Sequence, residues 1–200
     1  IVSAFAALVS SGGAPRASIY MGKRDNQSAE QILSNCFVLQ IVVSFILTAV
    51  LLIWSEDILL AFGASENTIS YAVDYMHIYA IGTLFVQLTL GMNAFITAQG
   101  FTTTSMISVL IGAICNITLD PIFIFGFHMG VKGAALATVL SQAVSTIWVI
   151  FFLCGKKTQL HLRKKYMHLE AKVIIPCVTL GLATFIMQAS ESVVTVCFNS

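Results

Sequence analysis

The sequence predicts an all-α, polytopic bundle of membrane-spanning helices, and three observations lead to that class. Hydrophobic residues make up 58% of the 200 residues, charged residues make up 10%, and the mean hydropathy is +0.90. A soluble domain of this size could not bury so much apolar surface. Apolar runs of about 20 residues, the length that crosses a bilayer, recur along the chain, and the basic residues collect in alternate connections between them.

Six spans are predicted. The first is rich in small residues from Ser10 to Gly13 and contains Pro15, so we expect it to line the interior of the bundle rather than to face lipid. The second follows a polar turn in which Ser28 is the predicted N-cap, and it ends at Trp54, an aromatic residue suited to the membrane interface. The spans cover residues 1–20, 31–54, 69–96, 105–126, 133–154 and 173–198.

The distribution of Lys and Arg predicts the orientation of these spans. Lys132 lies on one side of the predicted membrane, and the other nine basic residues lie on the opposite side. Because basic residues favour the cytoplasmic side, the loops 22–30, 97–104 and 155–172 are predicted to be cytoplasmic, in a multi-pass protein of the cell membrane. The nine residues are Arg16, Lys23, Arg24, Lys156, Lys157, Arg163, Lys164, Lys165 and Lys172.

The longest polar connection predicts a boundary between two helical lobes. Residues 155–172 are basic and several times longer than the other turns, so we expect a solvated, lipid-facing cytoplasmic linker there. Residues 1–154 then form five spans of an amino-terminal lobe, and residues 173–200 form the first span of a carboxy-terminal lobe. Since the chain starts without Met and stops in an apolar run, we expect an interior part of a longer polypeptide.

An acidic residue in the fourth span is the strongest sign of function. Asn116 and Asp120 are four residues apart, so on a helix they share one face. A charge at the centre of a bilayer costs about 2.5 to 3.5 kcal/mol, and Pro121 leaves the Ile117 carbonyl without its helical donor. Three oxygens in an apolar setting suit a small hard cation or a proton relay. The simpler interpretation is an interfacial carboxylate at a helix end.

The third span carries polar and aromatic residues with more than one interpretation. Gln87, Thr89 and Asn93 either contact a substrate or join neighbouring helices by hydrogen bonds. Asp74 and His77 lie either at the membrane interface or at the rim of a water-filled cavity. Three further residues are candidates to line a cavity for flat organic cations: Phe85, Met92 and Phe95.

The five cysteines predict packing rather than metal or disulfide chemistry. They lie mostly in apolar runs, without a C-x-x-C motif and without His at ligand spacing. They are Cys36, Cys115, Cys154, Cys177 and Cys197.

Four motifs together resemble the multidrug and toxic compound extrusion (MATE) transporters. They are Gly22-Lys-Arg-Asp-Asn, Ala98-Gln-Gly100, Asn116-x-x-x-Asp120-Pro-x-Phe-Ile-Phe and Gly130-x-x-Gly-Ala-Ala-x-Ala-Thr138-x-x-Ser-Gln142. The resemblance covers essentially the whole chain. It implies a twelve-helix, two-lobe transporter of which this chain supplies roughly spans two to seven. It also implies efflux of organic, often cationic, drugs or toxins by antiport with Na+ or H+, not an enzyme.

The resemblance also implies which residues bind the coupling ion. Asn116, Asp120 and Thr138 match the family's cation or proton site, with Na+ possible at these three residues and the Ala134 backbone as a further ligand. An acid of the family's first span would complete that site. Glu191 matches a second site in the carboxy-terminal lobe of some bacterial members, although its surroundings depart from that pattern. Gln188 is a polar neighbour that could neutralise Glu191 or line the cavity.

Other functions are weighed against efflux of drugs. An exporter or flippase of lipid-linked or polysaccharide substrates would share the fold. A membrane prenyltransferase would need several carboxylates for Mg2+ and diphosphate, and no second Asp cluster follows Asp120. A purely structural membrane subunit would leave Asp120 and Glu191 unexplained. We expect a monomer in the lipid bilayer that acts on a small organic substrate, with no nucleic acid partner and no cofactor apart from the coupling ion.

Overall fold

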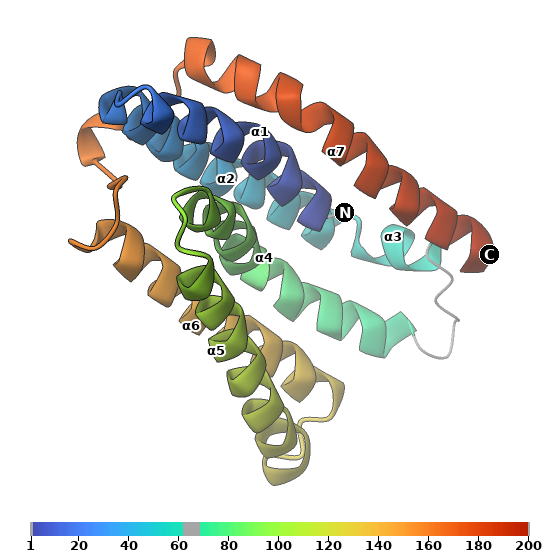
Figure 1. The fold of residues 1–200 in the computed structure, drawn as a ribbon. Helices are drawn as coiled ribbons and strands as arrows, with labels where there is room; N and C mark the ends of the chain where they lie inside the picture. Colours follow the sequence, from blue (N-terminus) through green and yellow to red (C-terminus); the bar gives the residue numbers. More distant parts are fainter. Residues whose placement is uncertain (1, 62–68, 200) are drawn as a thin grey trace.

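A computed structural model describes residues 2–61 and 69–199, with the side chains of residues 61 and 195–199 excepted. The described residues form helices and no strands, which confirms the all-α class (Figure 1). A π-helical turn, Ile122–Gly126, extends α5, and a 3-10 turn, Lys164–Tyr166, precedes α7. The helices are α1 (Val2–Gly22), α2 (Asn26–Ile53), α3 (Ser55–Ala61), α4 (Ile69–Ala98), α5 (Thr102–Pro121), α6 (Val131–Cys154) and α7 (Ala171–Asn199).

Within the described residues, five helices are long and apolar enough to cross a membrane, namely α2, α4, α5 with its π-helical turn, α6 and α7. They match five of the six predicted spans. The remaining predicted span forms α1, whose sequence falls outside this apolar group. Its small residues, Gly12 and Gly13 among them, are buried because α1 packs against α2, α4 and α7. The sequence did not predict the short helix α3, which lies in the acidic connection.

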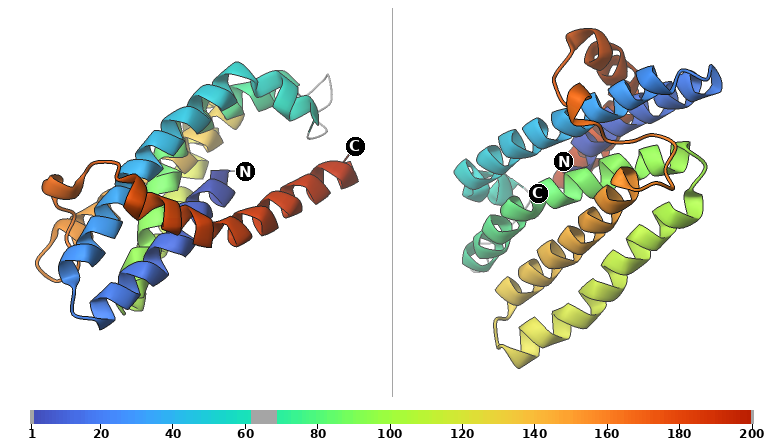
Figure 2. Two further views of the ribbon diagram at one scale, coloured as in Figure 1. Left: turned by 90° about the horizontal axis from the view of Figure 1, so that it is seen from above. Right: turned by 90° about the vertical axis from the view of Figure 1, so that its left-hand side faces the viewer.

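A close backbone approach joins α1 to α7. A Cβ atom on Gly12 would lie 1.8 Å from the Cys177 carbonyl oxygen, and a Cβ atom on Gly181 would lie 1.8 Å from the Leu8 carbonyl oxygen. Only glycine therefore fits at either position. The two helices run antiparallel along one side of the bundle (Figures 1 and 2). Thus α7, which the sequence assigns to the carboxy-terminal lobe, packs directly on α1 of the amino-terminal lobe.

On the opposite side of the bundle, α5 and α6 form an antiparallel hairpin, with α6 beside α4 (Figure 2). The π-helical turn follows Pro121, and the connection to α6 passes through His128 and Gly130, which have positive φ angles of 53° and 55°. Gly133, at the start of α6, allows the Phe123 backbone to approach, since a Cβ atom there would lie 2.9 Å from the Phe123 carbonyl. The hairpin leaves Asp120 near its tip.

The main hydrophobic core lies where α1, α2, α4, α6 and α7 meet, and it includes Cys36 of α2 and Cys177 of α7. These two cysteines are free thiols with no exposed surface, as packing residues would be. Cys115 is half-buried and Cys154 is exposed, and both are free thiols as well. The side chain of Cys197 lies outside the described residues.

The basic segment 155–172 is only partly the solvated loop that the sequence predicts, because several of its residues are buried against the helices. Gln99, which is 7% exposed at the end of α4, accepts three hydrogen bonds on its Oε1 atom: from Thr158 Oγ1 at 2.7 Å, from the Gln159 N–H at 2.9 Å and from the Leu160 N–H at 3.0 Å. The Leu160 side chain is fully buried in the main core. The prediction of a solvated loop holds for the exposed charged residues but not for the docked ones, because length and charge, on which it rested, do not show which side chains are buried. The cytoplasmic position of the segment stays a prediction.

Two buried residues of α2 hold the same segment further along. Glu30 accepts from Arg163 Nε at 2.6 Å and from the His161 N–H at 3.2 Å. Asn35 donates to the Tyr166 carbonyl at 3.3 Å, and its Oδ1 atom accepts from the Glu170 N–H at 2.7 Å. Buried polar groups need such partners because an unpaired one costs free energy. The ends of α2 and α4 therefore fix the path of the segment.

The start of α2 is capped by Asp25 and not by Ser28. The Asp25 carboxylate accepts from the Ser28 N–H at 3.1 Å and from the Ser28 hydroxyl at 2.6 Å. Hydrogen bonds from the Ser28 side chain and backbone lower the pKa of Asp25 below its usual value. The prediction missed the cap by one turn, because a Ser inside the first turn can serve as donor to a preceding Asp.

We predict that Gln99→Leu loosens the docked segment. The substitution removes the shared acceptor and leaves the Gln159 and Leu160 N–H groups without it, at a cost of about 1 to 3 kcal/mol for each buried donor that stays unpaired, while the Thr158 hydroxyl keeps the Leu160 carbonyl as acceptor. Trypsin should then cleave faster after Lys156, Lys157 and Arg163, as measured by mass spectrometry of the digest. Gln159→Leu is the control, since that side chain is exposed in the same segment. Equal cleavage of the Gln99 variant and the wild type would contradict the role of Gln99.

Candidate functional site

A polar cavity of about 250 Å3 lies between α4, α5 and α6. It brings together Asn116 from α5 and Thr138 from α6, two residues that the sequence places in one site. Most of its lining carries hydroxyl or amide groups, which is unusual for helices as apolar as these. The polar lining residues are Thr89, Asn93, Asn116, Thr138, Ser141, Gln142 and Ser145.

Asp120 lies one turn beyond Asn116 and contacts it, although Asp120 is not among the residues that line this cavity. The Asn116 amide donates to Asp120 Oδ1 at 3.4 Å, as the spacing of four residues predicts. Both side chains are half-buried. Because the amide donates through Nδ2, its Oδ1 atom is left to accept or to coordinate. The carboxylate and the amide are therefore in contact, and each has an oxygen that can coordinate a cation.

The α6 side of the site is formed by Thr138 and Ala134. The Thr138 hydroxyl donates to the Ala134 carbonyl at 3.0 Å, so the two oxygens that the sequence assigns to this site are in direct contact. A hydroxyl that donates within its own helix still has lone pairs to offer a cation. The described residues contain no group of three or more His, Cys, Asp and Glu that could hold a metal ion. The donor set is one carboxylate with neutral oxygens, which suits Na+ or a proton.

Hydrogen bonds between helices involve two residues that line the cavity, Thr89 and Asn93. The Thr146 hydroxyl lies 2.8 Å from the Thr89 hydroxyl and 3.0 Å from the Phe85 carbonyl. Asn93 Oδ1 accepts from Ser108 Oγ at 2.9 Å. Thr89 and Asn93 thus join helices and also line the cavity. Sequence reasoning missed Ser108, Ser145 and Thr146, whose only sequence signal is a hydroxyl at helical spacing in an apolar run.

The other residues of the predicted cavity do not line this one. Gln87 is fully buried and donates to the Val2 carbonyl at 3.0 Å, so it joins α4 to α1. Met92 and Phe95 have no exposed surface and belong to the main core, which corrects the expectation that they line a cavity. Phe85 is half-buried, and its carbonyl accepts from Thr146. The helical spacing of these residues is the same whether they face a core or a cavity, so the sequence could not show which of the two they face.

Glu191 and Gln188 lie on α7, apart from the polar cavity. Glu191 is exposed and Gln188 is half-buried. The Gln188 carbonyl accepts from the Ser192 hydroxyl at 3.1 Å. The structure therefore does not bring these two residues to Asp120, and a role for them in a second site stays a prediction.

Asp74 forms an ion pair that joins α4 to the start of α6. Lys132 Nζ lies 3.1 Å from Asp74 Oδ2, and both side chains are about half exposed. His77 Nε2 lies 3.2 Å from the Ser55 hydroxyl of α3. These contacts favour the interfacial interpretation, since they satisfy both groups at the ends of helices. Lys132, the one basic residue predicted on this side, has a carboxylate partner.

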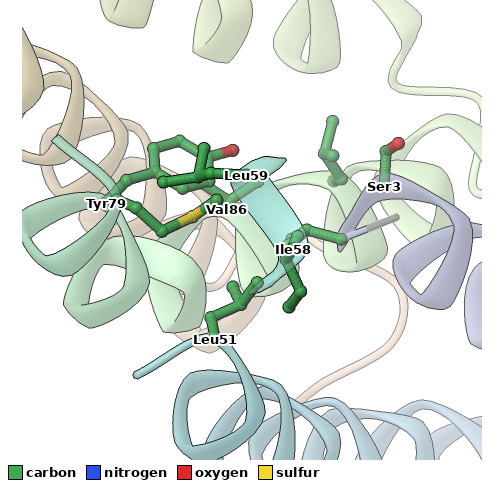
Figure 3. A pocket seen from close by; sticks show the side chains of 9 residues that line it. Ser3, Leu51, Ile58, Leu59, Tyr79 and Val86 are labelled. Carbon is green, nitrogen blue, oxygen red and sulfur yellow. The ribbon is translucent and has the colours of Figure 1, made fainter. Parts of the chain in front are cut away.

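A second cavity, of about 460 Å3, lies between the start of α1, the end of α2, α3 and α4 (Figure 3). Leu51, Ile58, Leu59, Val86 and Tyr79 surround it, and Ser3 lies at the α1 side (Figure 3). Its size is within the range of about 300 to 1,000 Å3 that is usual for ligand pockets. The cavity is apolar, with one aromatic ring.

Comparison with known proteins identifies the family. The sequence model described as MatE matches residues 1–122, more than half of the chain. The chain belongs to the MATE family of multidrug transporters. It is 30% identical over 187 residues to the multidrug export protein MepA of Staphylococcus haemolyticus, covering 94% of this chain and 41% of the relative. It is 25% identical to MepA of Staphylococcus saprophyticus, covering 94% of this chain and 42% of the relative.

Solved MATE transporters share the fold. An inward-facing multidrug resistance MATE transporter matches with a TM-score of 0.91 at 23% identity, covering 98% of this chain and 44% of that one. A MATE transporter in the bent conformation matches with a TM-score of 0.88 at 24% identity, covering 95% and 43%. The present chain therefore spans less than half the length of its relatives. It is a multi-pass membrane protein whose relatives are export proteins rather than enzymes.

We predict that Thr146→Val destabilises the contact between α4 and α6. Valine keeps the shape but removes the hydroxyl that bridges Thr89 and the Phe85 carbonyl, so the loss should be about 1 kcal/mol. The midpoint of thermal unfolding in detergent should fall. Thr118→Val is the matched control, because the exposed Thr118 hydroxyl donates only to carbonyls of its own helix. The same midpoint for both variants would exclude this bridge as a stabilising contact.

Proposed function

We propose that the protein exports small organic compounds, many of them cationic, by antiport with Na+ or H+. One observation carries the proposal: Asn116 and Thr138, from different helices, line one polar cavity, and the Asp120 carboxylate lies one turn away in contact with Asn116. Membership of a multidrug transporter family supports the reaction type. A structural subunit would have no use for a half-buried carboxylate in contact with a residue that lines a cavity.

The proposed ion site uses oxygens from α5 and α6. Asp120 supplies the charge, and Asn116, Thr138 and the Ala134 carbonyl supply neutral oxygens. Because an unneutralised carboxylate is costly within a membrane, Asp120 favours a state in which Na+ or a proton reaches it. One carboxylate neutralises one monovalent cation, which matches both candidates.

Coupling follows from the backbone beside Asp120. Pro121 cannot donate a hydrogen bond to the Ile117 carbonyl, and the chain continues as a wider π-helical turn. Such turns concentrate at functional sites. When an ion binds Asp120, the end of α5 can repack against α6, and the transporter shifts between its two conformations. A ligand shifts such an equilibrium only through its different affinity for the two states.

The substrate is proposed to contact the apolar cavity between α1, α2, α3 and α4. Its volume of about 460 Å3 suits a small organic molecule, and Tyr79 offers an aromatic face to a cation (Figure 3). In the proposed orientation, the loops 22–30, 97–104 and 155–172 are cytoplasmic and the protein works as a monomer in the cell membrane. The Lys132 and Asp74 pair then lies on the external side.

We predict that Asp120→Asn weakens gradient-driven efflux, because the uncharged amide has no negative charge for the ion to neutralise. Coupling free energies of about 1 to 3 kcal/mol imply a loss of roughly 5- to 150-fold in ethidium efflux. The assay uses vesicles containing the protein in its complete natural length, energised in turn by a Na+ gradient and by a pH gradient. The gradient that drives efflux identifies the coupling ion.

Asp57→Asn is the control, since Asp57 is an exposed carboxylate of α3 that lines neither of the two cavities. It should leave efflux unchanged. Thr138→Val should weaken efflux less than Asp120→Asn does, because it removes one neutral oxygen and keeps the charge. Efflux that depends equally on the gradient in the wild type and in Asp120→Asn would refute the proposed site.

A further inference from the structure

A third hollow lies at the end of the hairpin remote from Asp120, between the start of α5 and the end of α6. Its volume is about 430 Å3. Aromatic residues of α6, two lysines that follow α6 and Thr104 of α5 line it. None of the residues of the candidate ion site or of the cavity in Figure 3 belongs to it. Neither proposed step of transport uses it.

The aromatic side comes from the last two turns of α6. Trp148 is 37% exposed and Phe151 is 76% exposed, which is a large apolar surface for adjacent turns of one helix. Phe152 is held in place by an edge-to-face contact with Phe101, with ring centroids 5.2 Å apart. Tryptophan at the end of a membrane span marks the level of the lipid head groups. This wall therefore lies where an acyl chain begins.

The basic side consists of Lys156 and Lys157, directly after α6 ends at Cys154. Both side chains are exposed, and neither forms an ion pair with any carboxylate among the described residues. Lys132 and Arg163, in contrast, pair with Asp74 and Glu30. The two ammonium groups at this hollow are thus available to pair with a negatively charged ligand.

The start of α5, which borders the hollow, adds hydrogen-bond donors. Thr104 belongs to the first turn of α5, and Phe101 at the N-cap position offers no side-chain acceptor to that turn. The N–H groups of a first helical turn have no partner within the helix. A negative group between Thr104 and the two lysines would meet hydrogen-bond donors and positive charge.

We propose that this hollow binds an anionic phospholipid of the adjoining membrane leaflet. An acyl chain packs along Trp148, Phe151 and Phe152, and the phosphate lies at Lys156 and Lys157. A zwitterionic lipid would fill the apolar side but would bring its own cation to the lysines. The site therefore distinguishes lipids by head-group charge, as basic pockets between membrane helices do.

Tryptophan quenching tests the site directly. The protein is placed in phosphatidylcholine nanodiscs with a minor fraction of brominated phosphatidylglycerol or of brominated phosphatidylcholine. Quenching at Trp148 is obtained by subtracting the quenching measured with Trp148→Phe from the quenching measured with the wild type. We expect a preference for the brominated phosphatidylglycerol on the order of tenfold, given the attraction of two lysines to an anionic lipid.

A matched pair of double variants separates this site from general surface charge. Lys156→Gln with Lys157→Gln should remove the preference. Lys164→Gln with Lys165→Gln should keep it, because those lysines are exposed in the same segment but do not line the hollow. Thermal unfolding of both variants checks that each is folded.

Three results would overturn the proposal. Equal quenching by the two brominated lipids would show that head-group charge is not recognised. An equal loss of preference in both double variants would assign the effect to the charge of the whole segment. An absence of quenching by either lipid would show that the hollow is covered by another part of the protein.

Discussion

The structure depends on one constraint, which is that a polar group inside a membrane has to find its partner within the protein. Helices meet that need for the backbone, and the side chains meet it by donating to carbonyls of neighbouring helices. Thr146, Gln87 and Ser145 all do so, each toward a different helix. These bonds fix the positions of α1, α4, α5 and α6 relative to one another. The cavity with Asn116 and Thr138 exists because the helices around it are held in this way.

The same constraint explains what the sequence could predict. Apolar runs have to be helical in a membrane, so their number and approximate limits followed from composition. The contact between Asn116 and Asp120 followed from the spacing of four residues along one helix. Thr138, in contrast, was placed in the site only through resemblance to a family. No local pattern indicates that α6 turns this residue toward α5.

Features that depend on tertiary contact escaped prediction for a physical reason. Gln99 is one amide in a short turn, and only the folded chain shows that three donors of the later segment converge on it. Met92 and Phe95 have the same periodicity whether they face a core or a cavity. The π-helical turn after Pro121 depends on how α5 meets α6, since Pro121 alone would also permit a simple kink.

The crossing of α1 and α7 at Gly12 and Gly181 has a consequence for exchange of segments between relatives. Each glycine faces the backbone of the other helix rather than a side chain. A misfit at such a contact cannot be relieved by a change of rotamer, because the obstructing atoms belong to the main chain. In a chimaera built from two transporters, α1 and α7 would therefore have to come from the same parent. A set of helices that can be exchanged between two transporters must therefore include both α1 and α7, although the two helices are far apart in this sequence.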